Sequence, residues 1–189
     1  MPLRWARVLA ASRRKIVSLS VLRDSGTDKE NHGRAGDHAL GRSGRVLAVR
    51  LLPGQDVVQG IIGLIKEKNL RSGTITAIGS LRSATVVYPN SMEFGDNPMD
   101  VAVFHKMEGP VELGLGHGIF GREEDGEVGM HFHGLIMDKN GNMRTGNLMP
   151  GSAPVLATVD LTIQEFEGLE IKPTLDPAWK NKFLHPVAK

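Results

Sequence analysis

Two histidines spaced two residues apart, His131 and His133, are the residues of this chain whose types and spacing most directly suggest chemistry. Side chains alternate between the two faces of a β-strand, so a strand here would place both imidazoles on one face and Phe132 on the other. Two imidazoles on one face can bind a borderline-soft divalent metal such as zinc, but a protein site normally takes three or four ligands. The pair therefore predicts an incomplete metal site. The alternative is a histidine pair that hydrogen-bonds within a sheet or an interface without metal.

Glu112 is a candidate for acid–base chemistry. A general base must come within hydrogen-bond reach of the proton it removes. We therefore expect Glu112 to act in catalysis, or as a hydrogen-bonding partner of a metal ligand, only if the fold brings it beside the histidines. Otherwise it is a surface carboxylate on an edge strand. No nucleophile-elbow pattern G-x-S-x-G occurs in the chain, which favours a protein that is not an enzyme.

Two further motifs have simpler explanations than ligand binding. Residues 116–121 match G-x-G-x-x-G, but in a dinucleotide fold this turn opens a helix. Here it is followed by residues 122–127, whose four acids suit a solvated loop and would repel phosphate. Asp138, Asn140 and Asn142 imitate the start of a calcium-binding loop, but Met149 stands where the bidentate glutamate belongs. We therefore predict no dinucleotide site and a β-turn after Asp138.

Composition bounds the class of protein. The chain has 189 residues, 40% hydrophobic and 23% charged, as expected for one ordinary globular domain with some excess. No run approaches the roughly 18 apolar residues of a membrane span, so no membrane partner is expected. The absence of cysteine excludes disulfides, thiolate nucleophiles and cysteine-based zinc sites.

The charge is divided unevenly along the chain. Residues 1–44 carry nine basic and four acidic residues, whereas the remainder carries 14 basic and 17 acidic residues. Residues 1–22 contain five basic residues, three serines and no acid, which is the composition of a mitochondrial transit peptide. A disordered basic tail is the alternative. The predicted location is mitochondrial if this segment is a transit peptide and cytoplasmic or nuclear otherwise.

The folded domain is expected to span residues 45–167, after a polar, glycine-rich linker over residues 24–44. A strand over residues 45–52 is followed by a helix over residues 56–69, because Asp56 can cap it and apolar residues recur there at helical spacing. The remaining predicted strands cover residues 74–81, 84–89, 101–107, 111–120, 128–138 and 155–164.

These elements predict the fold class. Most connections are too short for the crossovers that parallel strands need. We therefore expect a single α+β domain with a largely antiparallel sheet and one prominent amphipathic helix. Residues 168–189 form a C-terminal extension that contains three prolines and cannot be a long helix. Trp179 and Phe183 are expected to dock this extension against the domain or a neighbouring subunit.

Residues 45–167 resemble the PPC domain, the plant and prokaryote conserved domain that also occurs in AT-hook nuclear proteins of plants. Four local patterns carry the resemblance: Leu52-Pro53-Gly54-Gln55-Asp56-Val57, Ala77-Ile78-Gly79-Ser80-Leu81, Gly109-Pro110-Val111-Glu112-Leu113, and His131-Phe132-His133 followed by Asp138 and Gly141. The resemblance implies an α+β fold with an antiparallel sheet and a homotrimeric assembly.

The resemblance also implies a zinc site with one altered ligand. In many prokaryotic members a Gly-Gly-His-Leu segment adds a third histidine to the His-x-His pair. The corresponding residues here are 145–148, and Asn147 stands at the position of that histidine. An amide oxygen is a much weaker zinc ligand than imidazole. His117 or His105 would substitute only if the fold brought one of them close.

Plant members of the family pair this domain with Arg-Gly-Arg-Pro hooks that enter the A·T minor groove. This chain has Gly41-Arg42-Ser43-Gly44-Arg45 instead, and its predicted domain is net acidic, so DNA is an expected partner only through a local basic patch. We predict a trimeric PPC-domain protein that acts as an assembly or regulatory module associated with DNA. The alternative is a small metal-dependent enzyme or ligand-binding protein that uses His131 and His133.

Overall fold

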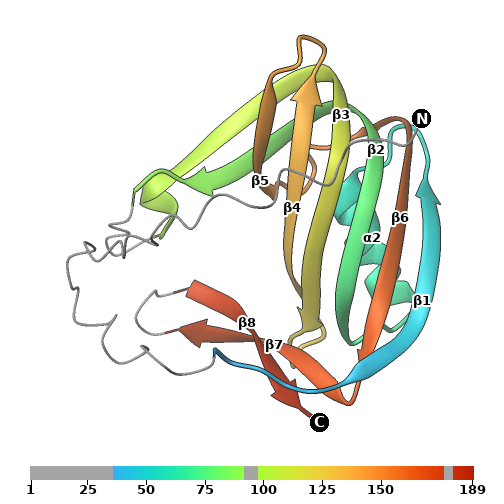
Figure 1. The fold of residues 1–189 in the computed structure, drawn as a ribbon, viewed down its shortest axis with the longest axis vertical. Helices are drawn as coiled ribbons and strands as arrows, with labels where there is room; N and C mark the ends of the chain where they lie inside the picture. Colours follow the sequence, from blue (N-terminus) through green and yellow to red (C-terminus); the bar gives the residue numbers. More distant parts are fainter. Residues whose placement is uncertain (1–35, 92–97, 177–180) are drawn as a thin grey trace, which may run out of the picture. The chain divides into compact units, whose positions relative to one another are not determined.

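A six-stranded antiparallel sheet dominates the computed structural model, which describes residues 36–91, 98–176 and 181–189. The strand order is β1-β6-β2-β3-β4-β5 (Figure 1). Residues Asp37–Lys189 form one compact unit. The predicted leader, most of the predicted linker and Trp179 lie outside the described residues. The strands of the sheet are β1 (Arg42–Leu51), β2 (Ser72–Pro89), β3 (Ala102–Arg122), β4 (Val128–Asp138), β5 (Met143–Leu148) and β6 (Val155–Glu167).

The helix α2 (Val57–Glu67) lies where the sequence predicts it. The Asp56 carboxylate accepts a hydrogen bond from the backbone N–H of Gln59 at 2.9 Å, which caps the helix start. Asn69 adopts a left-handed conformation with φ of 50°, which ends the helix. The apolar stripe of α2 is fully buried against one face of the sheet (Figure 1). Because α2 has only 11 residues and strands dominate the described residues, the α+β prediction is right only in part.

Two predicted chain breaks are absent. β2 runs without interruption through residues 82–83, where the sequence suggested a turn, and β3 runs through Gly109-Pro110. The pairing of β2 with β3 shifts register near residues 78 and 82, and the strand continues through these irregularities. The long β2–β3 pair then extends past its neighbours and curls back, so that Val86 and Val87 of β2 also pair with β5 (Figure 1).

The C-terminal extension forms a hairpin of β7 (Leu169–Asp176) and β8 (Asn181–Ala188), which agrees with the prediction that it is not a long helix. The hairpin is tied to the sheet by a hydrogen bond of 2.9 Å from the backbone N–H of Ile171 to Ser72 Oγ. A short 3₁₀ turn, η1 (Pro98–Val101), precedes β3. Neither described helical segment has the length and apolar character that a bilayer span requires.

The sheet has one covered face, and its opposite face is open except where the β7–β8 hairpin packs on Gly121 and Gly129; we call this second face the bare face. The covered face holds the core, which includes Ile75, Phe120, Phe132, Ile136 and Ile163, each fully buried. On the opposite face a single register row crosses all six strands through Ala48, Thr162, Thr76, His117, His133 and Asn147. The histidines predicted to act in chemistry therefore lie on the bare face.

Candidate functional site

His131 and His133 lie on the exposed face of β4, and Phe132 between them is fully buried in the core. The predicted alternation is therefore present. The Phe132 ring packs directly on Gly116 of β3, where a side chain would not fit, because a Cβ there would lie 2.6 Å from the Cζ atom of the ring. A Cβ on Gly118 would lie 2.3 Å from the carbonyl oxygen of His131. The first two glycines of the G-x-G-x-x-G pattern thus serve close packing of β3 against β4, inside a strand and not at a helix start.

The two imidazoles meet edge to face. Their Nε2 atoms are 2.9 Å apart, and their ring planes are inclined by 78°. A hydrogen bond at this distance requires one Nε2 to donate its proton and the other to accept it. Partial burial of His133 is the larger cause that lowers its pKa below the usual histidine value, and the nearby charge of His131 lowers it further. The geometry of the pair therefore needs at least one Nε2 atom without a proton, so that it can accept from the other ring.

Asn147 of β5 is the cross-strand partner of His133, so the structure places it next to the pair. Its side-chain oxygen, however, accepts a hydrogen bond of 3.3 Å from the backbone N–H of Phe132. The β4–β5 ladder ends at His133. The Asn147 side chain therefore supplies a hydrogen-bond acceptor for the backbone N–H of Phe132, the residue just before the end of the ladder. Asn147 therefore has a structural role that competes with metal ligation.

The donor set within one chain does not fit a zinc site. Two imidazoles converge, and the amide oxygen beside them is committed to the backbone. Over the described ranges, no group of three or more histidine, aspartate or glutamate side chains is arranged to hold a metal ion. A zinc site takes three or four protein ligands. Zinc at His131 and His133 therefore remains an expectation from the sequence.

The other sequence candidates divide into one neighbour and two distant residues. His117 of β3 is the direct cross-strand partner of His133 on the same exposed face. His105 pairs with Val86, in the part of β3 beyond Gly109-Pro110. Glu112 is opposite Met137, four positions along β4 from His133. At about 3.3 Å per residue this separation is roughly 13 Å, so Glu112 cannot serve as a base for the histidine pair.

A cavity of about 470 Å³ adjoins the pair. His131, His133 and Asn147 lie at one side of it, and residues of the β7–β8 hairpin, including Phe183 and Leu184, form the opposite wall. We expected Phe183 to dock the extension, but no pattern in the sequence indicates that it lines the same cavity as the histidines. Residues so distant along the chain share no local pattern, so only the fold shows that they meet.

The turn after β4 also follows the sequence prediction. The Asp138 carboxylate accepts hydrogen bonds from the backbone N–H groups of Asn140 and Asn142, at 2.8 and 2.9 Å. These bonds and the amide of Asn142 lower the pKa of Asp138 below the usual aspartate value. The carboxylate thus closes a β-turn, as predicted for this segment.

Comparison with protein families identifies a domain family that matches most of the chain. The Plants and Prokaryotes Conserved (PCC) domain matches residues 38–167, which is more than half of the chain. The match begins seven residues before the start expected from the sequence and ends at the same residue. Comparison with curated protein sequences finds no match.

Several solved structures share the fold. A plant- and prokaryote-conserved (PPC) protein from Pyrococcus horikoshii is 19% identical, with a TM-score of 0.65 over 80% of this chain and 98% of that chain. A metal-containing protein from Archaeoglobus fulgidus is 22% identical, with a TM-score of 0.65 over 80% and 99%. A candidate DNA-binding protein from Bacteroides thetaiotaomicron is 17% identical, with a TM-score of 0.63 over 77% and 97%. At these identities the likeness shows the fold alone.

Proposed function

Because the chain belongs to the Plants and Prokaryotes Conserved (PCC) domain family, whose motifs it was predicted to carry, we propose that it acts as a homotrimeric assembly or regulatory module. The observation that carries this proposal is the bare face of the sheet. Ile78, Leu115, Leu135 and Met137 on this face expose 54%, 48%, 41% and 40% of their surface. A contiguous patch of large exposed apolar side chains is typical of a protein interface.

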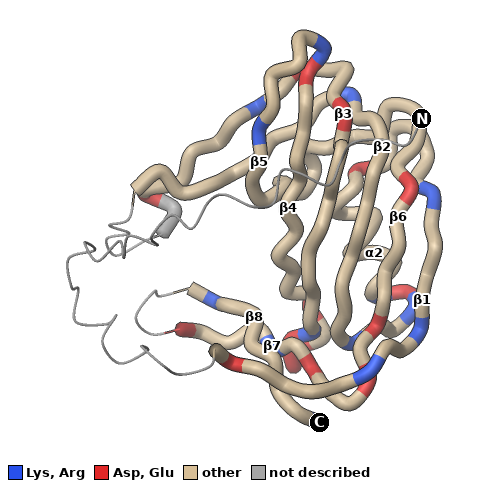
Figure 2. The backbone as a smooth tube through the Cα atoms, in the orientation of Figure 1, with Lys and Arg blue, Asp and Glu red and all other residues tan. Residues whose placement is uncertain are grey.

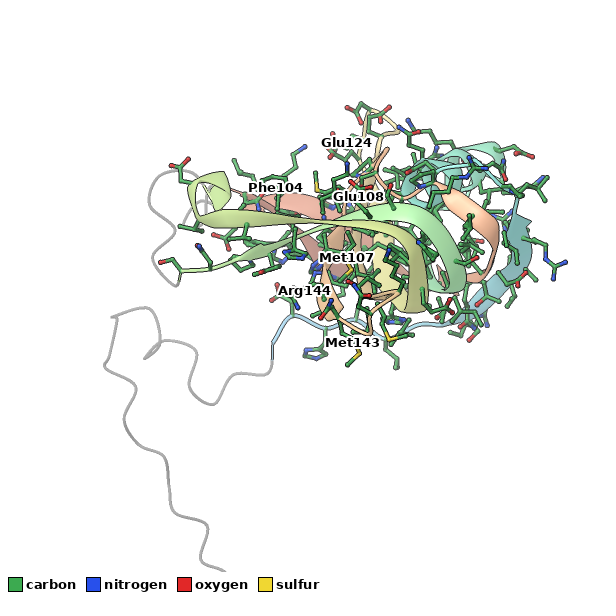
Figure 3. The ribbon with its side chains drawn as sticks, turned by 90° about the horizontal axis from the view of Figure 1, so that it is seen from above. Phe104, Met107, Glu108, Glu124, Met143 and Arg144 are labelled. Carbon is green, nitrogen blue, oxygen red and sulfur yellow. The ribbon has the colours of Figure 1, made fainter. Side chains whose placement is uncertain are left out.

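The apolar side chains form a ridge on one half of the face. Leu115 of β3 and Leu135 of β4 are direct cross-strand partners, and Met137 lies two residues further along β4. Met143 of β5, the partner of Met137, continues the ridge and projects outward beside Arg144 (Figure 3). Burial of a whole side chain of this kind contributes about 1.5–3 kcal/mol, so each half-exposed one would add roughly half of that in an interface.

The other half of the face is a shallow hollow of about 590 Å³ over β1, β6 and β2. Small side chains, including Ala48, Thr76 and Thr162, line it, and an ion pair of 2.8 Å between Arg50 and Asp160 borders it. The ridge and the hollow are different patches of the same face. If the ridge of one copy packs into the hollow of the next copy, the two copies use different surfaces and the contact is head-to-tail. Head-to-tail contacts that close generate rings, which favours a cyclic trimer over a two-fold dimer.

Disulfide trapping tests this arrangement, because the chain has no cysteine of its own. In the variant Leu135→Cys/Thr162→Cys the two positions lie on β4 and β6, three strand spacings or roughly 14 Å apart within one chain. A disulfide needs Cα atoms within about 7 Å, so only neighbouring copies can be linked. We expect covalent trimers on a non-reducing gel. Each single variant is the matched control, and dimers formed by Leu135→Cys alone would contradict the ring.

We propose a ligand-binding site at His131 and His133 as the second candidate function. It is supported by the 470 Å³ cavity beside the pair, a volume typical of small-molecule sites. The distance of Glu112 from this cavity argues for binding and against catalysis. The ligand-binding titrations of the variants Leu184→Asp and His133→Phe, described below, test this candidate function.

We assign association with DNA to the basic residues 1–44 and not to the sheet. Acids of β6 neutralise cations along β1: Arg42 lies 3.1 Å from Glu167, and Arg45 lies 2.7 Å from Glu165. Basic and acidic positions also lie side by side along these two strands in Figure 2. Phosphate binding requires cations that are free to replace counterions. We expect the full chain to bind duplex DNA, with loss of binding when five basic residues of the N-terminal segment become glutamine: Arg4, Arg7, Arg13, Arg14 and Lys15. Equal binding by this variant in a gel-shift titration would contradict the assignment.

A further inference from the structure

The cavity beside the histidine pair has a polar end and an apolar body. Its polar end is formed by His131, His133 and Asn147. Its walls are mostly apolar and come from four parts of the fold: Val87, Tyr88, Pro89, Ala102, Met130, Pro173, Phe183 and Leu184. A few convergent polar groups in an otherwise apolar cavity are typical of a site for a small organic molecule.

The hairpin that forms one wall is seated by a pair of glycines. Gly121 of β3 and Gly129 of β4 are direct cross-strand partners. A Cβ on Gly121 would lie 1.8 Å from the carbonyl oxygen of Ile171, and one on Gly129 would lie 2.5 Å from Cγ of Pro173. The sheet can therefore approach β7 closely only because both residues lack a side chain. The close packing of β7 on these two glycines holds the hairpin wall of the cavity in place.

The charged groups at the cavity are already paired. Lys182 of β8 forms an ion pair with Glu123, which directly follows β3, and the hydrogen bond to Glu123, followed by its charge, raises the pKa of that lysine. Among the residues that the structure describes, no other lysine, arginine or acid lines the cavity. A phosphate or other dianion would therefore lack a free cation, and an organic cation would face two imidazoles and a lysine. The lining suits a ligand with at most one negative charge.

The polar end offers hydrogen-bond donors in particular. The amide NH₂ of Asn147 donates no hydrogen bond among the described residues, since its oxygen alone is engaged. In the imidazole pair, the neutral ring that accepts at Nε2 carries its own proton at Nδ1, so the pair holds one ring N–H besides the proton it shares. Two or three neighbouring donors match the two oxygens of a carboxylate, which accepts hydrogen bonds without donating any.

We propose that this cavity binds a small monocarboxylic acid with an apolar body, its carboxylate on His131, His133 and Asn147 and its body against Phe183 and Leu184. This inference rests on the ligand-binding function proposed for the histidine pair. It adds the chemical class of the ligand and assigns the hairpin wall a direct part in binding.

Saturation-transfer NMR on the full chain tests the proposal with three probes: phenylacetate, indole-3-acetate and hexanoate. We expect at least one to bind at millimolar concentration or below, and its amide counterpart to bind at least tenfold more weakly. Leu184→Asp places a carboxylate in the apolar wall, and His133→Phe removes a donor; each should weaken binding at least tenfold. His105→Gln is the matched control, because His105 lines a different cavity. Its affinity should equal that of the wild type.

Binding by none of the three acids, or unchanged affinity in Leu184→Asp, would overturn the proposal. The titrations are run with and without chelator, and retention of binding in chelator assigns it to the side chains. Acid binding that appears only with added zinc would overturn the assignment to these donors. Light-scattering mass and thermal melting of each variant separate this test from the assembly: loss of acid binding by a variant that keeps the mass and melting temperature of the wild type supports the proposal. A wild-type chain that remains a trimer but binds none of the three acids overturns this inference alone.

Discussion

Replacement of Leu135 by lysine is expected to dissociate the trimer while each chain keeps its fold. Leu135 is 41% exposed in the single chain, so its exposed part contributes roughly 0.6–1.2 kcal/mol when a neighbouring copy covers it. The three copies in a trimer together lose about 2–4 kcal/mol. At 1.4 kcal/mol per factor of ten, the association constant should fall about 30-fold to several-hundred-fold. Desolvation of three lysine charges adds to this loss.

Sedimentation equilibrium over a range of concentrations measures this change. The matched control is Leu175→Lys, the same substitution at a side chain of the hairpin that is 60% exposed and does not belong to the bare face. We expect Leu135→Lys to shift toward the monomer and Leu175→Lys to sediment like the wild type. Equal masses for Leu135→Lys and the wild type, with both chains folded by circular dichroism, would refute the assignment of the interface to this face.

Three other predictions address the fold and the site. Asp56→Ala removes the helix cap and the acceptor for the backbone N–H of Ala153, so we expect a loss of about 1–2 kcal/mol in urea denaturation; a change below 0.5 kcal/mol would argue against the cap. Asn147→His should raise zinc affinity at least tenfold in a chelator competition, and an unchanged affinity would mean that the three residues do not form one site. The pKa of Glu165 lies below its usual value, chiefly because Arg45 donates a hydrogen bond to its carboxylate. The ionised carboxylate therefore stabilises the folded chain at pH values above its pKa in the unfolded chain, and this stabilisation is lost as the pH falls. Between pH 7 and 3 the wild type should lose more stability than Glu165→Gln, and parallel pH profiles would contradict this.

The sequence predicted best those features that depend on a few neighbouring residues. Asp56 at a cap position and apolar residues at helical spacing located α2 to within two residues. Alternation of apolar and polar residues located β6, and the two-residue spacing of the histidines assigned the faces of His131 and Phe132. In each case the signal and the structure it determines lie on the same element.

Features that depend on pairing between distant segments were missed. The irregular segment around Arg82 and the Gly109-Pro110 step resemble strand ends locally, but ladder pairing across β2 and β3 carries both strands through. β5 was not predicted, because Arg144 and Thr145 show no alternation and the strand exists through its partners on β4 and β2.

The candidate site shows the same difference between features that are local in the sequence and features that depend on distant residues. The two histidines were identified from spacing alone, whereas the place of Asn147 beside them came only from the resemblance to a family. Neither could show that the Asn147 oxygen is taken by the backbone of Phe132. The hairpin wall with Phe183 and Leu184 was likewise beyond local pattern, because it lies some fifty residues further along the chain.

The light-scattering mass of the wild-type chain at micromolar concentration tests the account most directly. The account predicts the mass of three 20.5-kDa chains, held together through the bare face of the sheet. The mass of a single chain would contradict it.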